Sequence, residues 1–166
     1  GMGGSVLAAE LLLNWKGSEL SVPLSVCREY QLPGYVNEKT LVVVSSYSGN
    51  TEETLSCLED AIVKEAQIVI MTSGGELLEN ATVNQMVHYR IPEGLQPRHS
   101  LLYQVKALAT LLESIDLLDG ATAELESAGQ WANDQIGSWI SKVPTAENSA
   151  KQLAGKLFGK IGVFYA

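Results

Sequence analysis

The chain has 166 residues, of which 46% are hydrophobic and 18% charged. This length and apolar content are enough for one globular domain with a sizeable core and an extension. The formal net charge of -8 argues against nucleic acid and against anionic membrane surfaces as partners. No apolar run approaches the roughly 20 residues that a membrane span requires, and we expect no signal peptide.

The cysteines and histidines give no sign of a metal or disulfide framework. Cys27 falls in a predicted strand and Cys57 in a predicted helix. Two cysteines with this placement favour a reduced, cytoplasmic protein over a disulfide scaffold. The two histidines and the absence of CxxC or HExxH spacing predict no metal site, and we expect no cofactor.

The apolar pattern predicts helices and strands that alternate along the chain. Taken in order, we expect a helix over 5–14 and strands over 22–28 and 41–45, then a helix over 51–66, strands over 68–71 and 86–91, and helices over 101–118, 125–140 and 150–157. Residues 86–91 mix polar and apolar types, which is typical of a sheet edge. This alternation predicts an α/β fold in which helices flank both faces of a parallel sheet, with ligands at the carboxyl ends of the strands.

The segment 41–53, which reads LVVVSSYSGNTEE, carries the clearest functional signal. A buried strand runs into a turn rich in hydroxyls and then into a helix, so backbone N–H groups and the positive end of a helix dipole point at one spot. No Lys or Arg lies between Lys39 and Lys64, so the implied anion site uses neutral donors. A sugar phosphate fits such a site better than a nucleoside triphosphate, which usually requires a P-loop lysine. The alternative is that the hydroxyls merely cap the helix, where Asn50 and Glu53 resemble a capping box.

The start of the chain, GMGGS at residues 1–5, is a second glycine-rich turn that opens into a helix. It lacks the GxGxxG spacing of a dinucleotide fingerprint, and no strand precedes it. Taken alone it is a weak motif.

The two long helices near the end of the domain differ in character. Residues 101–118 are apolar nearly all round, which predicts a buried helix. Residues 125–140 carry an apolar stripe with Trp131 and Trp139, which we interpret as core or as cover for a neighbouring domain rather than a ligand box. Residues 142–149, which include Pro144, are typical of a linker.

Four segments together carry a resemblance to a known family: GMGGS, SYSGNTEET, IVIMTSGG and GLQPRHSL, in this order and spacing. They resemble the sugar isomerase (SIS) domain, and Gln96-Pro97-Arg98 is similar to the bifunctional phosphoglucose/phosphomannose isomerase family in particular. The resemblance implies a flavodoxin-like three-layer sandwich. It also implies that residues 1–142 are an N-terminal-type SIS domain without its first strand, and that residues 143–166 are a linker and the start of a second SIS domain.

The resemblance assigns roles to seven residues. The phosphosugar would be held by Gly3, Gly4, Ser5, Ser46, Ser48 and Thr51. Arg98 would be catalytic and stabilise the enediolate formed between glucose or mannose 6-phosphate and fructose 6-phosphate, although a lone arginine before a helix is usually a solvated surface residue. The family's catalytic Glu and His have no matching position here, so we expect binding without turnover. A homodimer is also implied.

Two alternatives remain open at the level of sequence. A non-catalytic SIS module would sense a sugar phosphate for a partner protein, although the QPR segment argues against it. An inactive truncated fragment would have an incomplete pocket, and its terminal strand 161–166 would then fill the place of the missing first strand.

Overall fold

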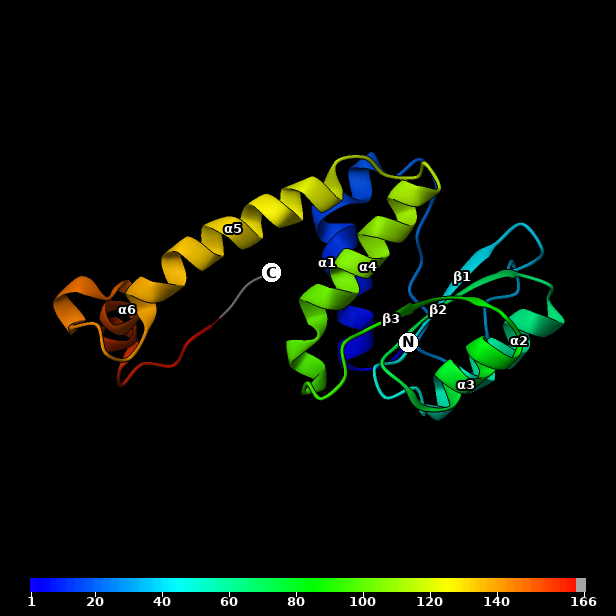
Figure 1. Ribbon diagram of the computed structural model, residues 1–166, viewed down its shortest axis with the longest axis horizontal. Helices are drawn as coiled ribbons and strands as arrows, with labels where there is room; N and C mark the ends of the chain where they lie inside the picture. The colour runs from blue at the N-terminus through cyan, green and yellow to red at the C-terminus, as the bar shows by residue number, and fades with distance from the viewer. Residues whose placement is uncertain (164–166) are drawn as a thin grey trace. The chain divides into compact units, whose positions relative to one another are not determined.

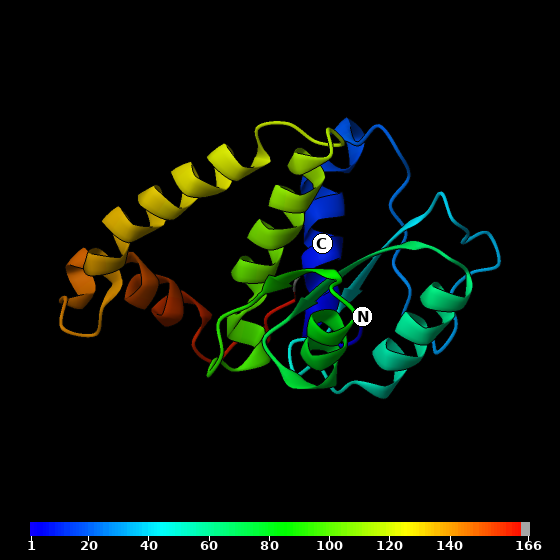
Figure 2. The same cartoon turned by 45° about the vertical axis from the view of Figure 1, so that its right-hand side comes forward.

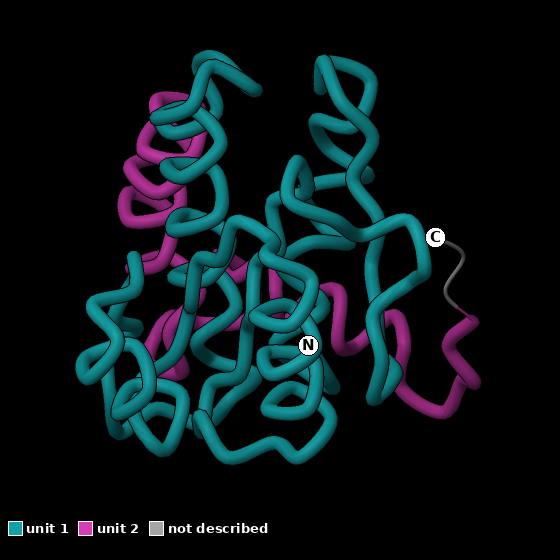
Figure 3. The backbone as a smooth tube through the Cα atoms, turned by 90° about the vertical axis from the view of Figure 1, so that its right-hand side faces the viewer, with its two compact units in different colours: residues 1–122 teal, residues 123–166 magenta. Residues whose placement is uncertain are grey.

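A computed structural model describes residues 1–163 of the chain. The chain divides into two compact units, the first covering residues 1–122 and the second beginning at Ala123 (Figure 3). The candidate site residues named above all belong to the first unit.

The first unit is built on a parallel sheet of three strands in the order β1-β2-β3. Strand β1 spans Leu41–Ser45, β2 spans Gln67–Thr72 and β3 spans Val87–Arg90. The prediction of these three strands is confirmed. Strand β3 lies at an edge of the sheet, as expected, and most of its residues are exposed. Since parallel strands end on the same side of a sheet, the loops after β1 and β2 are brought together.

One face of the sheet is covered by helix α2 (Glu52–Val63) and helix α3 (Gly75–Val83), which lie together in Figure 1. Alternate strand residues point to this face and join a buried cluster with both helices. Its fully buried members are Val44, Leu58, Ile70, Leu77 and Ala81.

Helix α1 (Gly4–Lys16) and helix α4 (Leu101–Ser114) pack against each other on the other side of the sheet, side by side in Figures 1 and 2. Leu12 and Val105 are fully buried there. Val69 and Met71, which alternate with the α2-facing residues of β2, are also buried. The predicted α/β sandwich, with helices on both faces of a parallel sheet, is therefore confirmed.

The predicted strand over residues 22–28 is wrong, because these residues form no ladder with a neighbouring strand. The Gly1 ammonium donates to the carbonyl oxygen of Cys27 at 3.2 Å. A methyl group on Gly1 would lie 2.8 Å from the carbonyl oxygen of Ser45. Residue 1 therefore lies between the end of β1 and residue 27, which keeps the two segments apart at this point.

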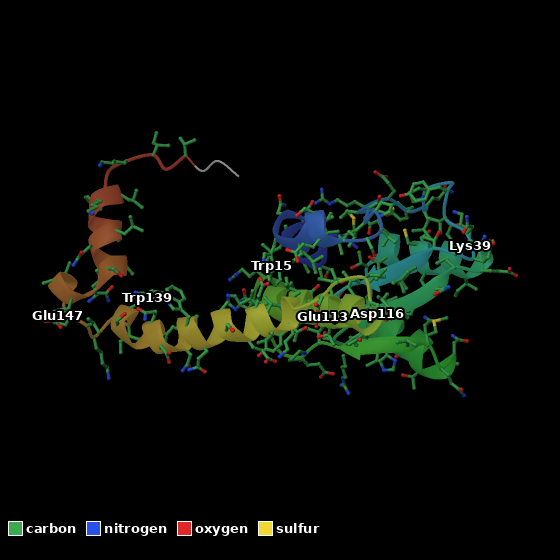
Figure 4. The ribbon with its side chains drawn as sticks, turned by 90° about the horizontal axis from the view of Figure 1, so that it is seen from above. Trp15, Lys39, Glu113, Asp116, Trp139 and Glu147 are labelled. Carbon is green, nitrogen blue, oxygen red and sulfur yellow. The ribbon has the colours of Figure 1, made fainter. Side chains whose placement is uncertain are left out.

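Helices α2 and α4 end three to four residues earlier than their apolar patterns predict. Helix α4 stops at Ser114, shortly before Asp116 (Figure 4), because Asp116 has a positive φ of 57°. The Leu117 N–H then donates back to the Leu112 carbonyl oxygen at 2.9 Å, which is the Schellman termination motif. Glu65 has a φ of 54° after α2, and the same motif follows.

The second unit contains most of helix α5 (Ala121–Trp139) and helix α6 (Ser149–Leu157). The predicted linker between them includes one short 3-10 helix at Thr145–Glu147. Trp139 lies near the end of α5 (Figure 4), and its ring contacts Trp131 edge to face with centroids 6.1 Å apart. Residues 161–163 have no regular secondary structure, and the rest of the predicted terminal strand lies outside the described residues. The division at residue 142 stays a prediction.

Among residues 1–163, no helix is both long enough and apolar enough to cross a membrane.

Replacing Leu77 with alanine tests whether the α2/α3 side of the sheet holds the first unit together. Leu77 is fully buried, so Leu77→Ala should lower the free energy of unfolding by about 2 to 5 kcal/mol. Leu102→Ala is the matched control, because Leu102 on α4 is 67% exposed and its loss should change stability by only about 0.5 kcal/mol. Urea unfolding followed by circular dichroism measures both, and equal losses would contradict the assignment of this core.

Candidate functional site

The loop after β1 gathers three of the predicted hydroxyls into one cluster. The Ser46 and Thr51 hydroxyl oxygens are 2.8 Å apart, and those of Ser46 and Ser48 are 3.4 Å apart. The Gly49 N–H donates to the Ser46 hydroxyl at 3.2 Å, which closes the turn. Ser46 is buried whereas Ser48 is exposed, so the cluster opens toward solvent at Ser48.

Close backbone packing fixes the shape of this loop. Gly49 has a φ of 74°, and a Cβ there would lie 1.8 Å from the Gly74 carbonyl oxygen. Ser73 lies on the neighbouring loop after β2, and its N–H and hydroxyl both donate to the Tyr47 carbonyl oxygen at 3.1 and 2.6 Å. At position 49, only glycine can combine a positive φ with such a close approach to the Gly74 carbonyl oxygen. The two loops at the carboxyl edge therefore support each other.

Helix α2 begins at Glu52 with Thr51 as its N-cap, and no side chain caps its first turn. The predicted capping box of Asn50 and Glu53 is wrong. The Asn50 side-chain oxygen instead accepts from the Glu76 N–H at 2.9 Å, at the start of helix α3. The Thr51 hydroxyl is occupied by Ser46, so the α2 N-terminus keeps its dipole without a side-chain cap.

The glycine-rich start of the chain lies beside the hydroxyl loop. Ser5 is buried in the first turn of α1, and its hydroxyl accepts from the Tyr47 N–H at 3.0 Å. Gly3, with a φ of 51°, is the N-cap of α1, and it makes no side-chain cap bond. Two helix N-termini, those of α1 and α2, are thus joined through residues 5 and 47.

Arg98 lies on a short 3-10 helix, Pro97–His99, and its side chain is exposed. This element neighbours the start of α1, because a Cβ on Gly4 would lie 3.7 Å from the Pro97 carbonyl oxygen. The structure thus places Arg98 on the segment next to the α1 N-terminus, while no hydrogen bond ties its side chain to the serine cluster among the described interactions.

A buried polar chain links the Arg98 segment to the end of β1. The Ser45 hydroxyl donates to the Gln104 side-chain oxygen at 3.3 Å, and the Gln104 amide donates to the Ser100 hydroxyl at 2.8 Å. The Ser100 hydroxyl donates to the Pro97 carbonyl oxygen at 2.7 Å. Gln104 and Ser100 are both fully buried, so this chain fixes the base of the segment that carries Arg98.

Two residues of this arrangement are missed by reasoning from the sequence. The Tyr47 hydroxyl donates to the Pro92 carbonyl oxygen at 3.1 Å and accepts from the Leu95 N–H at 2.8 Å, which fastens the hydroxyl loop to the segment before Arg98. Gln104 is the other. A single glutamine inside an apolar helix is a signal that could have been noticed, whereas nothing marks the tyrosine.

The hydrogen-bond donors around the hydroxyl loop are uncharged hydroxyl and backbone N–H groups. The acidic residues Glu52 and Glu53 occupy the first turn of α2, where they suit the helix dipole but oppose a bound anion. The hydroxyl of Thr54, one residue further along, is buried and has no hydrogen-bond partner in the described part of the chain. An anion here must therefore be held by backbone N–H groups and hydroxyls.

Fold and site together define a class of protein. They describe a parallel α/β domain with a hydroxyl-rich loop at the carboxyl edge of its sheet, flanked by two helix N-termini and an arginine-bearing segment. This is the arrangement expected of a sugar isomerase domain.

Comparison with known proteins supports that class. The chain is 39% identical to the bifunctional phosphoglucose/phosphomannose isomerase of Caldicellulosiruptor bescii over 165 residues, which cover 99% of the chain and 49% of the relative. It is 34% identical to the protein of the same name from Aquifex aeolicus over 167 residues, 100% of the chain and 48% of the relative. It is also 32% identical to the D-glucosamine-6-phosphate 4-epimerase of Sulfolobus acidocaldarius over 169 residues, 100% of the chain and 50% of the relative.

These relatives confirm the resemblance to the bifunctional phosphoglucose/phosphomannose isomerase family, and with it the SIS domain. The chain spans about half the length of the curated relatives it matches. No known protein-family profile matches it.

Replacing Gly49 with alanine should disrupt the site loop and the sheet edge together. Gly49→Ala places a methyl group on the Gly74 carbonyl and should cost about 4 kcal/mol or more of unfolding free energy. Gly94→Ala separates steric overlap from backbone strain, since Gly94 has a φ of 79° but open space around it, and it should cost only about 1 to 2 kcal/mol. Thermal and urea unfolding of both variants measure the difference, and equal losses would show that the contact with Gly74 is unimportant.

Proposed function

We propose that the hydroxyl loop and the N-terminus of α1 bind the phosphate of a hexose 6-phosphate. The single observation that carries the proposal is the cluster of Ser46, Ser48 and Thr51 hydroxyls at an uncapped helix N-terminus. Gly3, Gly4 and Ser5 would add backbone and hydroxyl donors from the second helix. A sugar phosphate carries close to two negative charges at neutral pH, and such an array of donors suits it without a lysine.

The chain would then be the phosphosugar-binding part of an isomerase that interconverts glucose or mannose 6-phosphate with fructose 6-phosphate. Such a reaction moves a proton between two adjacent carbons through an enediolate, which carries negative charge that substrate lacks. Arg98, exposed beside the α1 N-terminus, would stabilise that charge. The base that moves the proton and the histidine that assists ring opening have no family-matched position among these residues, so the chain alone should bind without turnover.

The names of the relatives bear on how specific this proposal can be. The isomerases and the epimerase are named for different reactions, yet the names share a hexose phosphate. Phosphosugar binding is therefore better supported than either reaction. Two functions compete with this proposal. A non-catalytic sensing module would bind the sugar phosphate but would need no arginine for an enediolate, whereas an inactive fragment with an incomplete pocket would not bind it.

The same resemblance supports further proposals about the whole protein. We propose that the whole protein is a cytoplasmic homodimer. Residues 1–142 would form one phosphosugar-binding domain, and residues 143–166 would lead toward a second such domain. The length of the relatives, about twice that of this chain, is what supports a second domain.

Calorimetric titration with fructose 6-phosphate tests the phosphate site, with fructose as the ligand control. Binding should require the phosphate, and Ser48→Ala should weaken it by about 1 to 3 kcal/mol because a charged acceptor loses one donor. Ser18→Ala is the matched control variant. Ser18 is an exposed serine in the 3-10 helix Gly17–Glu19, which follows the end of α1 opposite to the one beside the loop.

Equal affinity of the Ser48 and Ser18 variants would remove Ser48 from the site. Titration with glucosamine 6-phosphate tests whether the chain instead binds the sugar for which the epimerase relative is named. In that case glucosamine 6-phosphate should bind more tightly than fructose 6-phosphate. A coupled isomerase assay on the same preparation should show no turnover, and activity would contradict the proposed lack of a base.

Arg98→Ala tests the role of the arginine. If its charge acts on the enediolate, the variant should lose more affinity for a hydroxamate that mimics this intermediate than for fructose 6-phosphate. His99→Ala, at the exposed neighbouring position, should change neither affinity. Uniform losses for both ligands would make Arg98 a plain anchor, and no loss would return it to the solvated surface.

A further inference from the structure

Residues 27–32, called here the strap, are fastened along helix α2 by several polar contacts. The Cys57 thiol donates to the Glu29 carbonyl oxygen at 3.1 Å. Further along, the Leu32 N–H donates to an Asp60 carboxylate oxygen at 2.8 Å, and the Lys64 ammonium donates to the Leu32 carbonyl at 3.3 Å. Lys64 and Asp60 form an ion pair at 2.6 Å. The strap is thus held to α2 over its length by bonds that α2 provides from successive turns.

Both cysteines of the chain bond the backbone of the strap. The Cys27 thiol donates to the Gln31 carbonyl oxygen at 3.4 Å, so it turns toward the same stretch of backbone that Cys57 contacts. Burial, together with the nearby Cys27, raises the pKa of the Cys57 thiol to about 11. The two thiols thus bond carbonyl oxygens two residues apart in the strap, Cys27 from the strap itself and Cys57 from α2.

The two thiols differ in their access to solvent. Cys57 is buried, with 6% of its surface exposed, whereas Cys27 is half-buried. A cavity of about 870 Å³ is lined by Cys27 and by most of the strap, together with Glu10 of α1. The hydroxyl loop contributes no residue to its lining. A reagent of the size of a tripeptide can enter beside Cys27, whereas the buried Cys57 does not line the cavity.

We propose that Cys27 and Cys57 form a reversible intrachain disulfide by exchange with a low-molecular-weight disulfide such as oxidised glutathione. The Cys27 thiolate attacks one sulfur of the reagent, and one molecule of glutathione thiolate leaves. Cys57 then gives its proton to solvent and attacks the Cys27 sulfur, which releases the second glutathione. Two protein thiols are oxidised by two electrons, and one glutathione disulfide is reduced to two thiols.

The disulfide would tie the strap covalently to the helix that follows the hydroxyl loop. Tyr30, in the middle of the strap, has its pKa raised chiefly by the charge of Glu53 in the first turn of α2, so the strap passes close to the start of this helix. A disulfide at residue 27, together with the bonds of Leu32 to Asp60 and Lys64, would hold the strap on both sides of Tyr30. The site is a modification site that stands apart from phosphosugar binding, and it holds whether or not that function does.

The test is incubation of the folded, reduced chain with oxidised glutathione, followed by thiol counting and peptide mass mapping. The chain should lose both free thiols, with a mass decrease of two hydrogen atoms and a cross-link between the peptides of Cys27 and Cys57. Cys57→Ser should instead keep one glutathione on Cys27. Cys27→Ser, which changes the more exposed position, should leave the Cys57 thiol unmodified while the fold is intact.

Three results would overturn the proposal. A glutathione adduct that persists on Cys27 in the unaltered chain would show that Cys57 cannot reach it. Disulfide-linked dimers on a non-reducing gel would show that Cys27 reacts between molecules. Two thiols that survive the incubation would show that neither is accessible. The mapping of the unaltered chain decides the matter even if one variant fails to fold.

Discussion

The candidate site depends on a backbone contact between two loops, where Gly49 of the loop after β1 rests on the carbonyl of Gly74 after β2. The parallel pairing of β1 with β2 brings both loops to one edge of the sheet. The contact then leaves no room for a side chain, so the turn that presents the Ser46, Ser48 and Thr51 hydroxyls has one shape. The shape of this edge thus depends on Gly49, a residue that itself carries no functional group.

Prediction from the sequence succeeds where the signal is local and apolar. The runs of β1 and β2 identify buried strands, and the hydroxyls after Val44 identify the loop that the structure places at the carboxyl edge. It fails where a distant partner decides the outcome. Asn50 looks like a cap for its own helix, yet its side chain caps α3 instead. Residues 22–28 have the composition of a strand, but a strand exists only where a neighbouring backbone completes its ladder.

The ends of helices and the support of the site follow the same rule. Glu65 and Asp116 take the left-handed conformation that glycine usually occupies after a helix, so their sequences carry no stop signal. Tyr47 supports the loop through bonds that span 45 and 48 residues, and Gln104 supports the Arg98 segment through a bond that spans 59 residues. Such contacts become visible only when the fold is known, whereas the serines that they position are legible from the motif.

The distribution of tryptophans makes the two compact units optically distinct. Trp15 lies on α1 of the first unit, while Trp131 and Trp139 lie on α5 within the second (Figure 4). The rings of the α5 pair are inclined by 64° with centroids 6.1 Å apart, an arrangement in which their electronic transitions couple. An exciton band in circular dichroism therefore reports on the second unit alone, so the melting of α5 can be followed separately from that of the sheet.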